Sequence, residues 1–204
     1  MELIELDFFY DYHCPFVYRA SQMLENVQKT GARNLEMRWR FFSLTQVNST
    51  APGWTLWDAP ESENVRGRLP FKAAEAARRQ GSFGPFHTAL LHARHSDDLD
   101  IDDITVVELV AESAGLDLER FRQDINDPSI LAPVARDHEE ARSGHGVFGT
   151  PTFVFPGGGA AYVRLDHAPS GDEAVRILDR IVAVGQHEPA ILEIKRPTRP
   201  TTPE

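Results

Sequence analysis

One short stretch near the N-terminus has the residue types and the spacing that thiol chemistry requires: Asp11-Tyr12-His13-Cys14-Pro15-Phe16-Val17. Cys14 is the only cysteine in the chain of 204 residues. The apolar run over residues 3–9 predicts a buried strand before it, and the periodicity of residues 15–30 predicts a helix after it. Because Pro15 suits the first helical position, where a missing N–H costs nothing, Cys14 is predicted to be the N-cap residue.

This position favours a reactive thiol over an inert one. A cysteine at a helix N-cap faces unpaired backbone N–H groups and the positive end of the helix dipole, which both favour the thiolate. The alternative for a lone cysteine is a buried structural residue, but the order of strand, Cys-Pro and helix favours reactivity. The neighbouring His13 would support a thiolate electrostatically when protonated, or its ring would point to solvent; the sequence leaves both open.

The composition excludes several classes of partner. Hydrophobic residues make up 41% and charged residues 25% of the chain, which is typical of a soluble globular protein. The formal net charge is −10, so neither a nucleic acid nor an anionic membrane surface is expected as a partner. We expect no secretory leader, because the first residues lack a charged-then-apolar pattern, and no apolar run approaches the ~20 residues that span a bilayer. A single cysteine cannot form an internal disulfide, and we expect a cytoplasmic protein.

Beyond the first helix, the pattern predicts a strand, a loop and a helical block. Residues 35–41 alternate apolar and charged side chains, which predicts a half-buried strand. Residues 43–60 are predicted to be irregular, and their Trp54 and Trp57 either fold onto the core or line a substrate wall. Residues 64–144 are predicted to be helical almost throughout. The predicted helix signals in this block are stops at Gly81 and Gly115 and starts at Asp102 or Asp103, Asp117 and Asp127-Pro128.

The C-terminal third predicts two strands and one helix. Residues 153–155 and 161–165, joined by a glycine-rich turn, predict a β-hairpin. The capping box Ser170-Gly171-Asp172-Glu173 predicts the start of a last amphipathic helix. Residues 144–149 match the dinucleotide pattern G-x-G-x-x-G, but that fingerprint must follow a strand and open a helix. Here the order is reversed, which argues against nucleotide binding.

The resulting order is β-α-β, a helical block, then β-β-α: an α/β thioredoxin fold with a mixed four-stranded sheet and an inserted all-helical subdomain. With the motifs Asp11-x-x-Cys14-Pro15-Phe16 and Gly146-Val147-Phe148-Gly149-Thr150-Pro151-Thr152-Phe153, the chain resembles the DsbA family, especially its FrnE-type branch. It is also similar to the related kappa-class glutathione transferases and 2-hydroxychromene-2-carboxylate isomerases. We expect a thioredoxin-like domain from residues 1–43 and 146–190 and an inserted helical subdomain from residues 60–145. The composition of residues 196–204 predicts a disordered tail.

The resemblance also implies roles for particular residues. Cys14 corresponds to the nucleophile, Pro151 to a cis proline facing it, and Thr150 to the residue whose backbone binds a thiol-containing substrate. Pro15, Phe16 and Val17 complete the expected substrate-binding set, and His13 is the second catalytic candidate. Val17 stands where the oxidoreductases carry a second cysteine, so a dithiol–disulfide cycle is not available.

We therefore predict a monothiol thiol–disulfide oxidoreductase. Cys14 would form a mixed disulfide with a glutathione-like, low-molecular-weight thiol as co-substrate, and a second thiol molecule would resolve it. Protein disulfides are further candidate substrates, and a homodimer is left open. No tightly bound cofactor and no metal are expected, because His87, His92 and His95 lack ligands at suitable spacing. Two alternatives remain open: a thiol-cofactor-dependent isomerase or glutathione transferase, and a non-catalytic thioredoxin-fold binding module.

Overall fold

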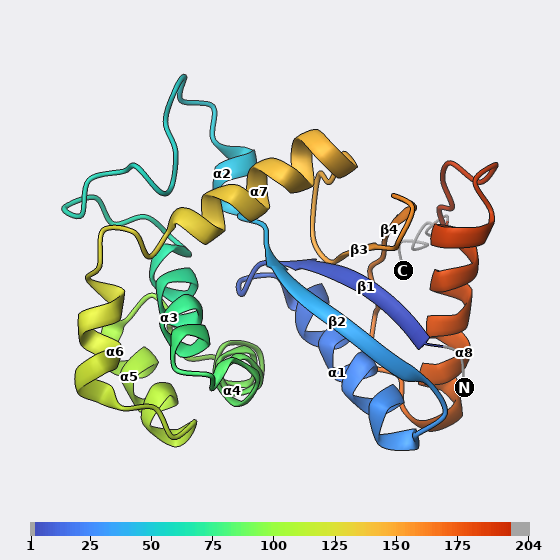
Figure 1. Ribbon diagram of the computed structural model, residues 1–204, viewed down its shortest axis with the longest axis horizontal. Coiled ribbons are helices and arrows are strands. Elements are labelled where there is room, and N and C mark those ends of the chain that lie inside the picture. The colour runs from blue at the N-terminus through green and yellow to red at the C-terminus, as the bar shows by residue number, and fades with distance from the viewer. Residues whose placement is uncertain (1–2, 197–204) are drawn as a thin grey trace, which may run out of the picture.

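The computed structural model describes residues 3–196, and its centre is a mixed four-stranded sheet in the order β2-β1-β3-β4 (Figure 1). β1 (Leu3–Tyr10) pairs in parallel with β2 (Asn34–Phe41). On its other side β1 pairs antiparallel with β3 (Thr152–Val154), which pairs antiparallel with β4 (Ala160–Tyr162). The predicted α/β fold class is confirmed. The predicted tail at 196–204 lies outside the described residues except for Arg196.

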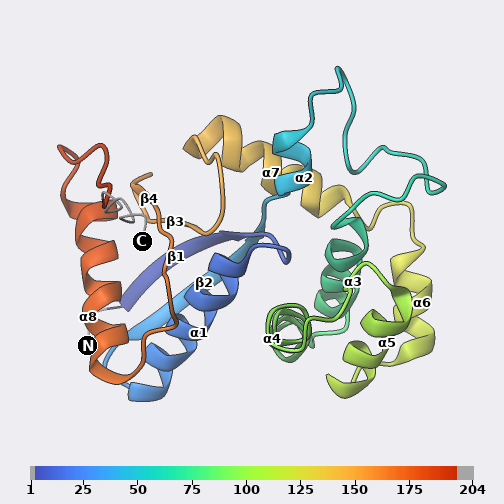
Figure 2. The same ribbon diagram turned by 180° about the vertical axis from the view of Figure 1, so that it is seen from behind.

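β1 lies between β2 and β3, and its residues 6–10 are buried on both faces, which explains why apolar side chains dominate this half of the strand. Phe8 and Tyr10 belong to the main core, into which α1 (Pro15–Thr30) inserts its apolar stripe. α1 lies behind β1 and β2 in Figure 1 and in front of them in Figure 2, and it packs beside α8 (Gly171–Val182). α1 ends at Gly31, whose φ of 66° is the left-handed conformation that glycine adopts without strain.

The opposite face of the sheet is covered by α7 (Ala132–His145), which packs on β2. Between them lies a smaller apolar cluster: Phe9, Phe42, Ala141, Val147 and Val154. Alternate residues of β1 therefore serve two cores, one on each face of the sheet.

The helical block stands beside the sheet (Figure 1). It consists of α3 (Arg68–Arg79), α4 (Phe83–His95), α5 (Ile104–Ser113) and α6 (Leu118–Ile125), which pack on one another, while α4 also contacts α1. As predicted, Asp103 and Asp117 cap α5 and α6 by accepting backbone N–H groups. A short π-helix, η1 (Ala183–His187), extends α8.

The predicted irregular loop is wrong in one part, because residues 44–48 form the short helix α2 (Leu44–Asn48). The Ser43 side chain caps it by accepting the Gln46 N–H at 3.0 Å. Five residues are too few for a periodic pattern to be visible in the sequence, so only the capping residue could have indicated this helix.

One predicted helix start is wrong, and another is confirmed without its predicted capping hydrogen bond. Asp127 accepts the N–H of Ser129 at 2.8 Å in a turn, and α7 begins only at Ala132. Ser170 is the N-cap residue of α8, but its side chain makes no capping hydrogen bond. Glu173, the expected partner of that capping box, lies 3.5 Å from the His167 ring instead.

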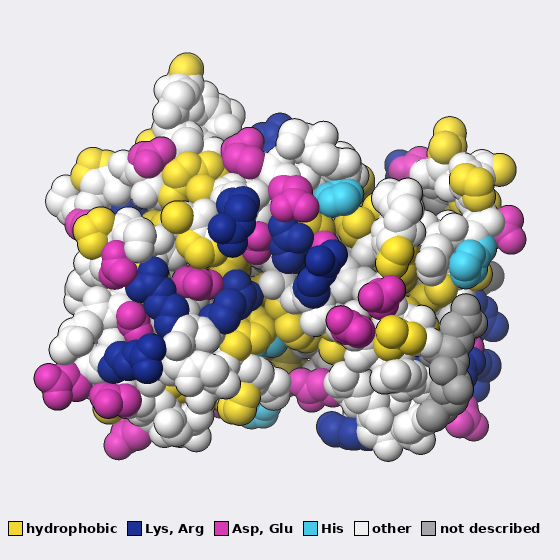
Figure 3. All heavy atoms as spheres, viewed as in Figure 1, with side chains coloured by type: hydrophobic (Ala, Val, Ile, Leu, Met, Phe, Trp, Pro, Cys, Tyr) yellow, Lys and Arg dark blue, Asp and Glu magenta, His cyan; other side chains and the backbone are white. Residues whose placement is uncertain are grey.

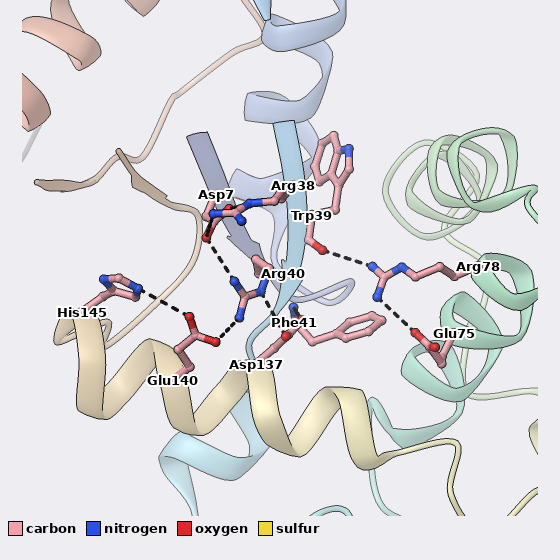
Figure 4. A network of polar contacts seen from close by, with 10 residues as sticks. All are labelled: Asp7, Arg38, Trp39, Arg40, Phe41, Glu75, Arg78, Asp137, Glu140 and His145. Carbon is pink, nitrogen blue, oxygen red and sulfur yellow. Dashed lines mark hydrogen bonds and ion pairs between the residues drawn. The ribbon is translucent and has the colours of Figure 1, made fainter. Parts of the chain in front are cut away.

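Arg40 of β2 anchors α7 to the sheet through a cluster of ion pairs (Figure 4). Its guanidinium lies 3.1 Å from Asp7 Oδ2 and 3.0 Å from Asp137 Oδ1, and it also pairs with Glu140. The second oxygen of Asp137 accepts the Phe41 N–H at 3.1 Å. Figure 3 shows basic and acidic side chains interleaved across the middle of this face. α7 leads directly into residues 146–151, so this cluster fixes where that loop begins.

Candidate active site

Cys14 is the N-cap residue of α1, and the loop after α7 faces it. Its backbone is extended (φ −86°, ψ 113°), and Pro15 occupies the first turn of the helix, as predicted. The thiol donates to the Thr150 carbonyl, with Sγ and O 3.3 Å apart. The Thr150–Pro151 peptide bond is cis. The two motifs therefore meet at one point although they are far apart in the sequence.

The thiol is less accessible than its position suggested. Cys14 is only 4% exposed, whereas reactive cysteines are ordinarily partly exposed. The covering comes from the loop after α7, whose Thr150 and Pro151 are themselves buried. The Thr150 hydroxyl is buried and has no hydrogen-bond partner within the described chain.

The first turn of α1 has an exposed and a buried side. Pro15 is exposed, and the half-buried Phe16 ring lies 4.0 Å from the Arg164 guanidinium and 5.4 Å from that of Arg19. Val17 is fully buried in the main core. The expected substrate contact of Val17 is therefore not available to its side chain, because an inward position on this helix faces the sheet.

Asp11 connects residues 11–14, the Cys14 loop between β1 and α1, to α2 through hydrogen bonds. Its two carboxylate oxygens accept the N–H groups of His13 and Leu44 at 2.8 and 2.7 Å. Burial raises the pKa of this carboxyl, although the two backbone hydrogen bonds oppose the shift. The contact with Leu44 could not be predicted from the sequence, because only the fold brings these two segments together.

His13 points neither to open solvent nor to the Cys14 thiol. Its Nε2 lies 3.0 Å from Asp102 Oδ2, in the segment before α5, and the His13 side chain is 10% exposed. Its Nδ1 lies 3.4 Å from the Arg66 guanidinium. Both contacts come from segments that flank helices of the helical block, so two parts of the fold meet at this residue.

A polar cavity of about 520 Å³ opens beside this loop. Its lining residues are Asp11, His13, Leu44, Thr45, Asn48, Ser49, Trp54 and Arg66. Trp54 and Trp57 both pack against the main core, as one interpretation predicted. Trp54 also lines the cavity, and the Trp57 ring lies 5.5 Å from that of His138. Arg66 and Asn48 were missed in the sequence, because isolated polar residues in loops carry no periodic signal.

Two histidines of α4 support the loop that carries Cys14. The Tyr12 hydroxyl lies 2.9 Å from His87 Nδ1, and the Tyr12 carbonyl lies 2.8 Å from His95 Nε2. Burial lowers the pKa of His87 to about 3 and also lowers the pKa of His95, so both rings are neutral at pH 7. Within residues 3–196, no group of three or more His, Cys, Asp or Glu side chains is arranged to hold a metal ion.

The sheet order, the helical block and the thiol opposite a proline loop define a protein of the thioredoxin fold. The model of the DSBA-like thioredoxin domain matches residues 5–172, and the chain belongs to this family. Among residues 3–196, no helix combines the length and the apolar character that crossing a membrane requires.

Solved structures of low sequence identity share this fold. A probable DsbA oxidoreductase from Streptomyces coelicolor superposes with a TM-score of 0.63 at 19% identity, covering 93% of this chain and 94% of that one. The cytosolic disulfide reductase DsbM from Pseudomonas aeruginosa, solved with GSH, gives a TM-score of 0.57 at 17% identity, covering 87% and 98%.

Sequence relatives include much longer proteins. A Na(+)/H(+) antiporter, NhaA 3, of Salinispora tropica is 31% identical over 167 residues, which cover 81% of this chain and 21% of the antiporter. The chain therefore spans about a fifth of the length of that relative. A Mycobacterium tuberculosis protein described as uncharacterized is 24% identical over 201 residues, covering 98% of this chain and 84% of that protein.

Proposed function

We propose that this protein is a thiol–disulfide oxidoreductase that acts through Cys14 alone, with a low-molecular-weight thiol as co-substrate. One observation carries the proposal: the only thiol of the chain lies at the N-cap of α1, 3.3 Å from the carbonyl of Thr150. Val17 fills the position one turn further along the helix, so no second thiol stands there to attack a mixed disulfide.

The reaction consists of two exchanges. Cys14 loses its thiol proton and attacks a disulfide R–S–S–R, which forms a Cys14–S–S–R bond and releases RS⁻, which takes up a proton. A second thiol, R′SH, then attacks the sulfur of the bound R group, forms R–S–S–R′ and returns Cys14 to the thiol. No electrons are gained or lost overall, because one disulfide replaces another.

The polar cavity supports a small co-substrate. Its volume of about 520 Å³ lies within the ~300–1,000 Å³ of small-molecule sites. The exposed Arg66 and the neighbouring Asn48 offer hydrogen-bond donors to a polar thiol of the glutathione type. Because DsbM was solved with GSH, glutathione is the first thiol to test. We place the activity in the cytoplasm, where such thiols are kept reduced.

The test is a mass-spectrometric survey of the thiol attached to Cys14 after mild oxidation, combined with Cys14→Ser. We expect a single small-thiol adduct on the wild-type chain and a loss of at least ~10³-fold in exchange with small disulfides in Cys14→Ser. Full activity of Cys14→Ser towards an electrophile plus glutathione would instead establish the isomerase or transferase alternative. A Cys14 that takes up no small thiol would support the non-catalytic binding module.

A further inference from the structure

Two guanidinium groups flank the ring of Phe16, in the first turn of the helix that Cys14 caps. The Cζ atom of Arg164 lies 4.0 Å from the ring centroid, and that of Arg19 lies 5.4 Å from it. Phe16 and Arg19 are three residues apart and are therefore neighbours on the surface of α1. Arg164 belongs to the segment after β4, so only the fold brings it here. These three residues form a basic surface next to the cysteine, the Phe16 patch.

The fold holds the Phe16 patch in place. The Arg19 Nη1 group donates to the Leu165 carbonyl at 3.0 Å, which connects the segment after β4 to α1. Because Leu165 is the next residue after Arg164, this hydrogen bond also fixes where the Arg164 side chain starts. The negative face of the Phe16 ring attracts a guanidinium without using any of its N–H groups. The ring therefore orients both cations and leaves their donors available.

Most of these donors have no partner in the part of the chain that the structure describes. Within residues 3–196, neither Arg19 nor Arg164 forms an ion pair, and Arg164 makes no hydrogen bond. The acidic residue closest to Arg164 in the sequence, Asp166, lies 3.3 Å from the His167 ring instead. A guanidinium carries five N–H donors in a fork that matches the two oxygens of a carboxylate. The Phe16 patch thus has the chemistry of a carboxylate-binding site.

We propose that the Phe16 patch binds a carboxylate of the small thiol that is joined to Cys14, an inference that rests on the proposed function. An extended glutathionyl group spans roughly 10 Å, so its carboxylates extend beyond the first turn of α1 while its sulfur is bonded to Cys14. A disulfide has two such halves, which leaves the polar cavity for the other half. The preferred substrates are therefore small disulfides that carry carboxylates.

The net charge of the protein makes this patch important for such substrates. The formal net charge is −10, so the chain as a whole repels an anionic disulfide. Two arginines in the turn that follows the thiol and beside it oppose this repulsion where the reaction takes place. Neutral and cationic disulfides gain nothing from the patch, so the charge of the substrate separates its contribution from the reactivity of the thiol.

The experiment compares an anionic, a neutral and a cationic disulfide: glutathione disulfide, 2-hydroxyethyl disulfide and cystamine. Intact-mass spectrometry follows the rate at which each attaches to Cys14 in the full chain. We expect Arg164→Gln to slow the attachment of glutathione about two- to fivefold and to leave that of 2-mercaptoethanol unchanged. Cystamine should react as fast or faster, because a repelling charge is removed. Arg19→Gln, which keeps a donor for the Leu165 carbonyl, should act in the same direction.

Three controls separate the patch from a general effect of charge. Arg176→Gln removes the same charge at an exposed position of α8 and should leave all three rates unchanged. Arg164→Lys keeps the charge but not the fork, and should recover part of the rate with glutathione disulfide. High salt should reduce the difference between the wild type and Arg164→Gln, because it screens exposed charges.

The possible failures of this inference and of the proposed function are distinguishable. Equal slowing with all three disulfides, or an effect of Arg176→Gln as large as that of Arg164→Gln, would overturn the Phe16 patch as a carboxylate site. Unchanged attachment of glutathione in both Arg164→Gln and Arg19→Gln would overturn it as well. Thermal midpoints show that the variants are folded. If no disulfide attaches to Cys14 of the wild type, the proposed function is wrong instead.

Discussion

Two pockets of this molecule, an apolar groove and the polar cavity beside the Cys14 loop, differ in size and in chemistry. The candidate active site lies at the smaller of the two. A groove of about 680 Å³ between α4 and α5 is lined mainly by apolar side chains, among them Val106 and Leu109. Its ionisable lining residues, His92 and Asp97, pair with each other at 3.1 Å. The polar cavity, of about 520 Å³, adjoins the loop of the only cysteine and is lined by acidic, basic and imidazole groups. Reactive groups, rather than volume, identify the candidate site.

The largest effect is expected from placing a second thiol one turn along α1 from Cys14. Val17→Cys puts a thiol one turn from Cys14, at a spacing where helix side chains are neighbours. The glutathione mixed disulfide at Cys14 should then resolve at least ~10-fold faster without added thiol, because the attack is intramolecular. Val17→Ala, which changes the same buried position without adding a thiol, is the control. Equal lifetimes of the mixed disulfide in both variants would show that this position is out of reach of Cys14.

An intermediate effect is expected from the buried His87, which lies behind the Cys14 loop on the helix that also lines the groove. Burial lowers its pKa from 6.5 to about 3, so below pH 6.5 the unfolded chain binds a proton that the folded chain does not. The free energy of unfolding should fall as pH falls, by about 2 kcal/mol between pH 7 and pH 5 from this residue. The buried His138, whose pKa burial lowers to about 4, acts in the same direction.

Urea unfolding at the two pH values measures this dependence. His87→Asn keeps an acceptor for the Tyr12 hydroxyl and should flatten the pH dependence. His92→Asn, at an exposed position in the groove, should leave the pH dependence of the free energy of unfolding unchanged. If the His87→Asn variant loses as much stability between pH 7 and pH 5 as the wild type, other groups cause the effect.

The smallest effect is expected in the groove itself. Leu109 is 65% exposed, so Leu109→Gln should change the free energy of unfolding by less than ~0.5 kcal/mol. The rate of thiol exchange should not change, because Leu109 lines the groove and is not among the residues that line the polar cavity. A clear loss of exchange activity in Leu109→Gln would show that the groove contributes to the reaction, and would contradict the distinction drawn between the groove and the polar cavity.

The features that the sequence predicted are local ones. The strand, the Cys14-Pro15 junction and the helix follow each other directly, and neighbouring residues determine each of them. The hairpin of β3 and β4 and the aspartate caps are local in the same sense. The family model then confirms that these pieces assemble as the DsbA-like fold.

The features that were missed depend on contacts between distant segments. Cys14 is buried because the loop with Thr150 covers it, and the capping cysteine alone carries no sign of that. The pairing of His13 with Asp102 joins the first loop to the helical block, and Asp102 was recognised only as a candidate cap. Arg66 stands in a loop without a pattern, so only the folded chain shows that it reaches His13.

The ion pairs of Arg40 have a consequence for the thiol that lies beyond their own face of the sheet. Asp7 belongs to the strand that leads to Cys14, and Asp137 belongs to the helix that leads to Thr150. One guanidinium is thus the common origin from which two branches of chain extend to the two sides of a single 3.3 Å contact. Any displacement along either branch changes the position of the Cys14 sulfur relative to the Thr150 carbonyl oxygen. Arg40 limits this displacement because it fixes the starting points of both branches.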